Sequence, residues 1–162
     1  MIDRSIARAL KTMIGALTLV IFVYALFRRL DNDEFECLHT AWKVLHNGTI
    51  FQDFFQHHHP FIYYLLAPLI KLFGPTTNII YLARTLMFSM FLGMGYATYL
   101  LAKTITNRGI AFDERIGLVS VLLLYSLPIF TVKAIEIRDF ILVPLLKESA
   151  CQMVSFTHQC PC

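Results

Sequence analysis

The sequence has little charge for its length. Only 15% of its 162 residues are Asp, Glu, Lys or Arg, whereas about 25% is usual in soluble domains. Its hydrophobic fraction is 57%, above the roughly 45–50% of such domains. The composition therefore excludes an ordinary soluble domain and predicts an integral membrane protein with the lipid bilayer as its first partner.

Two other classes of protein lack their signatures. The sequence shows no basic stripe, and its net charge is only +3, so nucleic acid is not an expected partner. The cysteines lack the spacing of a zinc site or a disulfide framework; they are Cys37, Cys151, Cys160 and Cys162. Internal repeats and low-complexity linkers are also absent.

The apolar residues gather instead into long uncharged runs over residues 12–27, 85–102 and 116–132. A membrane-spanning helix needs about 20 mostly apolar residues, and a helix satisfies its own backbone groups in hydrocarbon. The first run is interpreted as a retained anchor, because Arg28 and Arg29 occupy the place of a signal-peptide cleavage site. The sequence thus predicts an all-α fold with about three transmembrane helices, over residues 9–29, 79–103 and 116–134.

The orientation follows from the basic residues, which collect on cytoplasmic flanks. The N-terminal flank and the loop between the second and third runs are basic, with Arg4, Arg8, Lys11, Lys103, Arg108 and Arg115. If both are cytoplasmic, residues 30–78 and the stretch 136–139 lie on the external side. Arg28 and Arg29 oppose this rule.

The external segment 30–78 has structure of its own. Residues 33–47 (DEFECLHTAWKVLHN) place apolar side chains at helical spacing. Asp31 or Asn32 is suited to begin this helix, and the Asn47-Gly48 pair to end it. Residues 60–74 (PFIYYLLAPLIKLFG) predict a second, interfacial helix, so that both helices are expected to lie along the membrane surface.

Three clusters of polar residues are candidates for chemistry. Asp31, Asp33, Glu34 and Glu36 either form a solvated helix N-terminus or supply a general base. The run of Gln56, His57, His58 and His59 is either a polar hinge or a source of metal ligands, although consecutive histidines cannot all face one ion. Glu136 to Asp139 form either an ordinary helix end or a functional site at the membrane surface.

With these residues in view, the stretch 33–74 resembles the first external loop of the GT-C membrane glycosyltransferases, in particular bacterial relatives of protein mannosyltransferases and of aminoarabinose transferases. The shared pattern is an acidic pair (Asp33-Glu34), a glycine-bounded turn, and then D-F-F-x-H-H-x-P before an apolar helix. Residues 135–139 (IEIRD) are similar to the E-I-R-P-D stretch of the second external loop.

This resemblance implies an enzyme of the bacterial inner membrane, with loop 30–78 in the periplasm, that takes a sugar from a polyprenyl-phosphate donor. Asp33 would be the general base for an acceptor hydroxyl on a glycan, lipid or protein. Glu34 and Asp139 would be the other catalytic carboxylates. The implied substrate-binding residues are Asp53, His57, His58, Arg84 and Arg138.

The sequence also departs from the family pattern. Relatives commonly have Glu where this chain has Gln56, in some cases as a metal ligand beside the position of His57, so a divalent metal ion is not fixed by the pattern and no other cofactor is expected. The proline between Arg138 and Asp139 is missing. Residues 1–146 are expected to form the N-terminal part of a larger GT-C domain, and residues 147–162 an aberrant tail that reflects truncation or a frameshift. We expect no transfer activity from this chain alone.

Two alternatives stay open at the level of sequence. The chain could be a non-enzymatic membrane subunit that contacts a partner through the small residues Gly93, Gly95 and Ala97. It could also be part of a transporter, with Arg84 and Asp139 along a path. Both alternatives predict that Asp33→Asn has no effect.

Overall fold

The structure is a computed structural model that describes residues 2–56, 60–106, 114–128 and 131–132. Within these ranges the chain forms α helices and no β strand: α1 (Ile2–Phe27), α2 (Asn32–Leu45), α3 (Phe61–Phe73), α4 (Asn78–Thr106) and α5 (Glu114–Ser126). The predicted all-α class is confirmed for the described residues.

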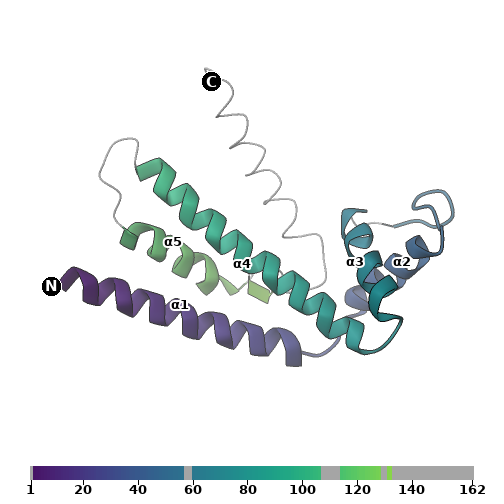
Figure 1. Cartoon of the computed structure of the whole chain (residues 1–162), viewed down its shortest axis with the longest axis horizontal. Helices are drawn as coiled ribbons and strands as arrows, with labels where there is room; N and C mark the ends of the chain where they lie inside the picture. Colours follow the sequence, from purple (N-terminus) through teal and green to yellow (C-terminus); the bar gives the residue numbers. More distant parts are fainter. Residues whose placement is uncertain (1, 57–59, 107–113, 129–130, 133–162) are drawn as a thin grey trace, which may run out of the picture.

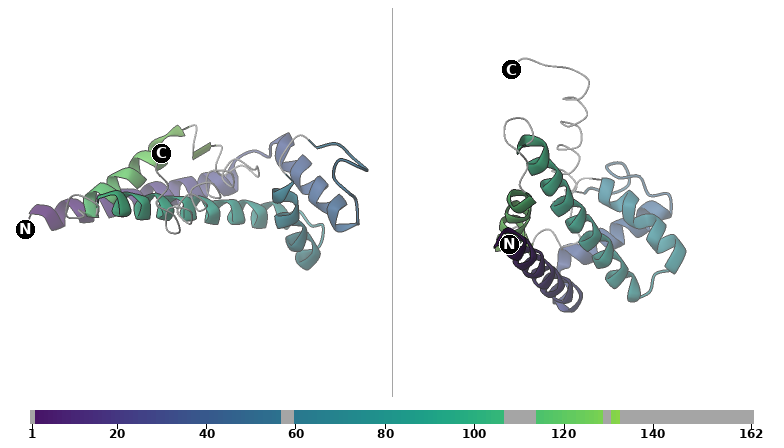
Figure 2. Two further views of the ribbon diagram at one scale, coloured as in Figure 1. Left: turned by 90° about the horizontal axis from the view of Figure 1, so that it is seen from above. Right: turned by 60° about the vertical axis from the view of Figure 1, so that its left-hand side comes forward.

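The long helices lie side by side, and the short helices α2 and α3 lie together at one end (Figure 1). α4 runs antiparallel to α1, and α5 packs against both. α2 and α3 pack on each other at the end of the molecule opposite the N-terminus, as the view from above also shows (Figure 2). The helices α1, α4 and α5 therefore run in alternating directions.

Two helices are long and apolar enough to cross a membrane: Ser5–Phe27 within α1 and Asn78–Ile105 within α4. The most apolar windows of these segments are only 11% and 28% buried by the rest of the chain. α5 has 13 residues, which is short for a span. The predicted third span, 116–134, continues into residues outside the described part of the chain and stays a prediction.

The boundaries of α2 are those expected from its sequence. Asp31 is the N-cap, and its backbone N–H donates to Oε2 of Glu34 at 3.3 Å, which is one half of a capping box. The helix ends at the C-cap His46, after which Asn47 adopts a positive φ of 67°. Asparagine tolerates this left-handed conformation better than most residues, so the Asn47-Gly48 stop is confirmed.

Two glycines allow α4 and α5 to approach closely. A Cβ added at Gly95 would lie 2.0 Å from the hydroxyl oxygen of Tyr125, and one added at Gly117 would lie 2.6 Å from the ring of Tyr99. Each glycine therefore accommodates a tyrosine of the other helix. Tyr125 also stacks on Phe91 with ring centroids 4.3 Å apart, and this packing continues the buried apolar cluster along α4.

Candidate functional site

A buried ionic cluster joins the three elements at the α2–α3 end of the long helices. It consists of Arg28, just after α1, Glu34 in the first turn of α2, and Arg84 in α4; we call it the Glu34 cluster. Glu34 is fully buried and Arg84 is 3% exposed. Charged side chains are almost never enclosed in this way unless they are paired, and the contacts below supply that pairing.

Arg84 is the centre of the Glu34 cluster. Its Nη2 lies 2.7 Å from Oε2 of Glu34, and its Nε donates to Oε1 at 3.3 Å. Its Nη1 donates to the carbonyl oxygens of Leu26 and Arg28 at 3.1 and 3.0 Å, and its Nη2 to that of Arg29 at 3.3 Å. Carbonyls at a helix end lack intrahelical partners, so Arg84 satisfies the end of α1 and the start of α2 together.

Arg28 completes the cluster, with Nη2 2.7 Å from Oε1 of Glu34. The side chain of Arg28 is only 9% exposed. This contact explains why Arg28 departs from the charge rule that placed basic residues on the opposite flank. Its partner within the chain is the buried carboxylate of Glu34.

The pKa of Glu34 depends on its burial and on its two arginine neighbours. Burial alone raises the pKa of this carboxyl, but the hydrogen bonds and positive charges of Arg84 and Arg28 outweigh that effect, and the pKa falls below its ordinary value of 4.5. The carboxylate is therefore ionised and engaged by two guanidinium groups. A general base needs a pKa nearer the working pH and access to the acceptor, so this geometry suits an anchoring role for Glu34.

Asp33, the predicted base, lies beside Glu34 in the first turn of α2. Its side chain is half-buried rather than enclosed. Because Glu34 is anchored to α1 and α4, Asp33 is held at the ends of these two apolar helices. Arg84, in contrast, is enclosed by Glu34 and three carbonyls. The structure thus shows an internal role for Arg84, and its contact with substrate stays a prediction.

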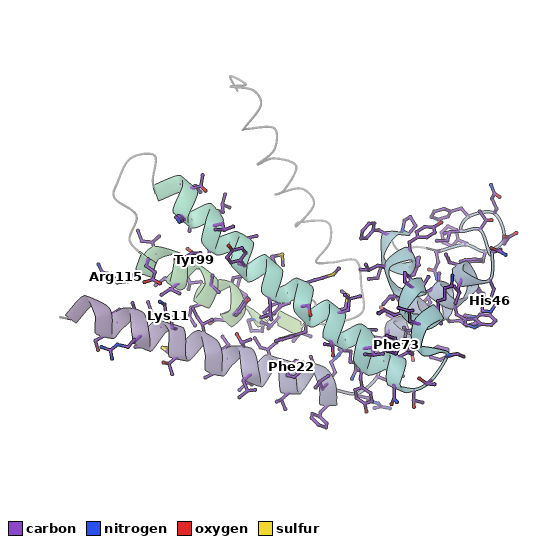
Figure 3. The ribbon with its side chains drawn as sticks, viewed as in Figure 1. Lys11, Phe22, His46, Phe73, Tyr99 and Arg115 are labelled. Carbon is purple, nitrogen blue, oxygen red and sulfur yellow. The ribbon has the colours of Figure 1, made fainter. Side chains whose placement is uncertain are left out.

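A second candidate region lies at the other end of α2. A pocket of about 420 Å³, which we call the Trp42 pocket, is lined by Trp42, Lys43, His46, Asn47, Gly48, Asp53 and Phe54. Asp53, a predicted substrate-binding residue, is exposed, and its Oδ2 accepts a hydrogen bond from the backbone N–H of Thr49 at 2.7 Å. His46, labelled in Figure 3, lies at this outer end of the molecule, far from Lys11.

The predicted histidine and second-loop sites cannot be placed. His57, His58, Arg138 and Asp139 lie outside the described residues. Gln56 is buried, and its amide donates to Oγ1 of Thr40 at 2.5 Å. Among the residues that the structure describes, no group of three or more His, Cys, Asp or Glu side chains is arranged to hold a metal ion.

Sequence reasoning missed two features of this end of the molecule. It did not pair Arg84 with Glu34, although an arginine near an apolar run and an external acidic pair were the available signals. It also did not predict the Trp42 pocket, which depends on how the turn after α2 folds back.

Comparisons of the chain with protein-family models, with curated proteins and with solved structures gave no match.

Proposed function

We propose that this chain forms the N-terminal part of a membrane glycosyltransferase of the GT-C type, which transfers a sugar from a polyprenyl-phosphate donor at the external face of the bacterial inner membrane. The observation that carries the proposal is the Glu34 cluster. It fixes the acidic first turn of α2 to the ends of the two apolar helices, so that Asp33 lies where a lipid headgroup would lie if those helices cross the bilayer.

The exposed apolar surface of the long helices supports their placement in lipid. Leu19 and Val20 of α1 are 63% and 64% exposed, and Tyr96 of α4 is 65% exposed. Soluble monomers rarely leave large contiguous apolar surfaces in water. A bilayer removes the free-energy cost of exposing apolar side chains to water. It also explains why an 18-residue window of α1 is only 11% buried by the rest of the chain.

The chemistry needs a base at headgroup depth, because the sugar–phosphate bond of the donor lies there. In the proposed reaction Asp33 takes the proton of an acceptor hydroxyl, whose oxygen forms a bond to the anomeric carbon. The bond from that carbon to the phosphate oxygen breaks, and the polyprenyl phosphate leaves with the electron pair. Cationic groups that offset the phosphate charge stabilise this step; His57 and Arg138 are the predicted ones.

Donor binding can be tested on the chain itself in lipid nanodiscs. A photoreactive polyprenyl-phosphate hexose should label residues within 30–78, and unlabelled polyprenyl-phosphate hexose should compete whereas polyprenol should not. Labelling that polyprenol displaces equally well would show recognition of the lipid chain alone and would contradict the proposal.

The role of Asp33 requires an activity assay. Because the resemblance implies an enzyme with further spans, transfer is measured on a protein in which residues 1–146 are joined to such spans. Asp33→Asn should lower kcat by roughly 10²–10⁴-fold with little change in KM, the usual contribution of a general base. Asp31→Asn is the matched control, since asparagine is an equally good N-cap. Equal activities of the two variants would refute the assignment.

The comparison of Asp33→Asn with Asp31→Asn also distinguishes the transferase from the two alternatives, a membrane subunit and part of a transporter. The small-residue face expected to contact a partner subunit is partly used within the chain, because Gly95 packs under Tyr125 of α5. The arginine expected to line a transport path is enclosed by Glu34 and backbone carbonyls. A silent Asp33→Asn variant would favour one of these alternatives.

A further inference from the structure

The Trp42 pocket offers a combination of groups suited to a polar ring. Trp42 is 40% exposed, and its indole provides an apolar surface. The other lining residues include Asp53, Asn47 and Lys43, which carry a carboxylate, an amide and an ammonium group. An open site with one aromatic surface, one anionic acceptor, one amide and one cation fits a molecule that has both C–H faces and many hydroxyl groups.

The walls of the pocket are held by bonds within the chain. The backbone N–H of Gly48 donates to the carbonyl of Lys43 at 2.9 Å, and that of Asp53 to the carbonyl of Thr49 at 2.9 Å. A Cβ at Gly48 would lie 3.0 Å from the Lys43 carbonyl oxygen and 3.1 Å from the Phe54 ring, so a larger residue here would require these neighbours to shift. The ammonium of Lys43 lies 5.1 Å above the Phe54 ring. A site ordered in advance loses less conformational entropy on binding.

His46 and Trp42 are also fixed relative to each other. Their ring centroids are 4.3 Å apart, and Nδ1 of His46 lies 2.8 Å from the carbonyl oxygen of Trp42. Asp53 is oriented by the hydrogen bond from Thr49 to Oδ2. The aromatic surface and the acceptor therefore have defined positions at the rim of a space of about 420 Å³, within the range of small-molecule sites.

A row of rings connects this pocket to the first turn of α2. Phe35, His39 and Trp42 follow one another along the exposed side of the helix, with centroids 6.3 and 6.1 Å apart and planes parallel to within 2° and 10°. All three also line a second groove of about 250 Å³, which Thr76 and Thr77 border. At a rise of about 1.5 Å per residue, Asp33 and Trp42 are roughly 13 Å apart along the helix, and the row of rings extends over most of that length.

From this arrangement we infer that the Trp42 pocket binds a saccharide, whose chain lies along the row of rings toward Asp33. That this saccharide is the acceptor glycan rests on the proposed function. That the pocket binds a saccharide rests on its aromatic and polar lining. Flat aromatic side chains contribute apolar contact to the C–H faces of the sugar, and Asp53 and Asn47 take the hydroxyls. Charged hydrogen-bond partners contribute more than neutral ones, so Asp53 is the main polar determinant.

The chain contains a single tryptophan, so its fluorescence reports on this pocket directly. Mannotriose titrated into the chain in nanodiscs should give a saturable change in Trp42 emission, whereas sorbitol at the same concentration should not. Asp53→Asn should weaken mannotriose binding at least about tenfold, since one hydrogen bond to a charged group is lost. Asp31→Asn, the same change at the opposite end of α2, should bind as the parent does.

Insertion of Trp42 into lipid is the competing outcome, because tryptophan is common at membrane interfaces. Nanodiscs containing brominated phospholipids should leave Trp42 emission largely unquenched. Strong bromine quenching together with no response to mannotriose would overturn the inference, and so would saturable binding that Asp53→Asn does not change. Saccharide binding without specific donor labelling would count against the transferase only, and donor labelling without saccharide binding would count against the Trp42 pocket only.

Discussion

Replacing Arg84 by methionine keeps a long, flexible side chain in α4 but removes the guanidinium group of the Glu34 cluster. The substitution removes two contacts to the Glu34 carboxylate and three hydrogen bonds to the carbonyls of Leu26, Arg28 and Arg29. Glu34 would remain buried and ionised with Arg28 as its remaining partner within the cluster. The variant should therefore lose the connection between α1, α2 and α4 and should unfold more easily.

The size of this loss follows from the burial of both charges. Breaking a buried ion pair by removing one partner typically costs about 3–5 kcal/mol, whereas replacing both partners by apolar groups costs much less. We expect Arg84→Met to lower the free energy of unfolding by about 3–5 kcal/mol. The double variant Arg84→Met/Glu34→Leu should lose roughly 1–3 kcal/mol less unfolding free energy than the sum of the losses in the two single variants, which is the usual coupling of residues in one network.

The assay is unfolding of the purified chain by SDS in mixed dodecyl maltoside micelles, followed by helical circular dichroism. Arg29→Met is the matched control, because the Arg29 side chain is exposed and its backbone carbonyl, which accepts from Arg84, is unchanged. Equal unfolding curves for the Arg84 and Arg29 variants would refute the reasoning. Additive effects of the Arg84 and Glu34 substitutions would refute it as well.

Three further predictions concern pH, helix packing and topology. The folded-state pKa of Glu34 is below its ordinary value of 4.5. The contribution of Glu34 to stability should therefore be complete above pH 4.5 and lost as the pH falls through the folded-state pKa. SDS unfolding curves between pH 7 and pH 3 should show this loss, and a Glu34→Gln variant should lack that part of the pH dependence. Gly95→Ala should destabilise the chain by about 1–3 kcal/mol through overpacking, whereas Gly93→Ala, where an added Cβ meets nothing within 4 Å, should not; equal midpoints in SDS would contradict the helix contact. In a cysteine-free background, Asn32→Cys should react with an impermeant maleimide from outside intact cells and Thr104→Cys only after permeabilisation, and labelling of both from one side would contradict the topology.

The local elements could be predicted from the sequence because local interactions set them. The uncharged runs gave the two long helices, and the period of apolar residues in 33–47 gave α2. Its boundaries followed from the capping preferences of Asp31 and of the Asn47-Gly48 pair. Each of these signals acts over a few residues along the chain, so no knowledge of distant contacts was needed.

The partners of the polar residues could not be predicted in the same way. Arg84 and Glu34 are separated by 50 positions in sequence, and either could have faced lipid headgroups, solvent or substrate. The direction of α4 against α1 decides that Arg84 meets both the carbonyls at the end of α1 and the carboxylate at the start of α2. The acidic pair thereby acquires two different environments, one enclosed and one half-buried.

The sequence by itself determined that the chain is helical, apolar and divided into long helices with an amphipathic segment between them, because composition and periodicity are properties of neighbouring residues. The tertiary structure alone decided that Glu34 is an anchor beside the more open Asp33, and that Trp42, Asn47 and Asp53 surround one pocket. Both outcomes depend on the packing of helices and turns in space, where burial makes each charge require a specific partner.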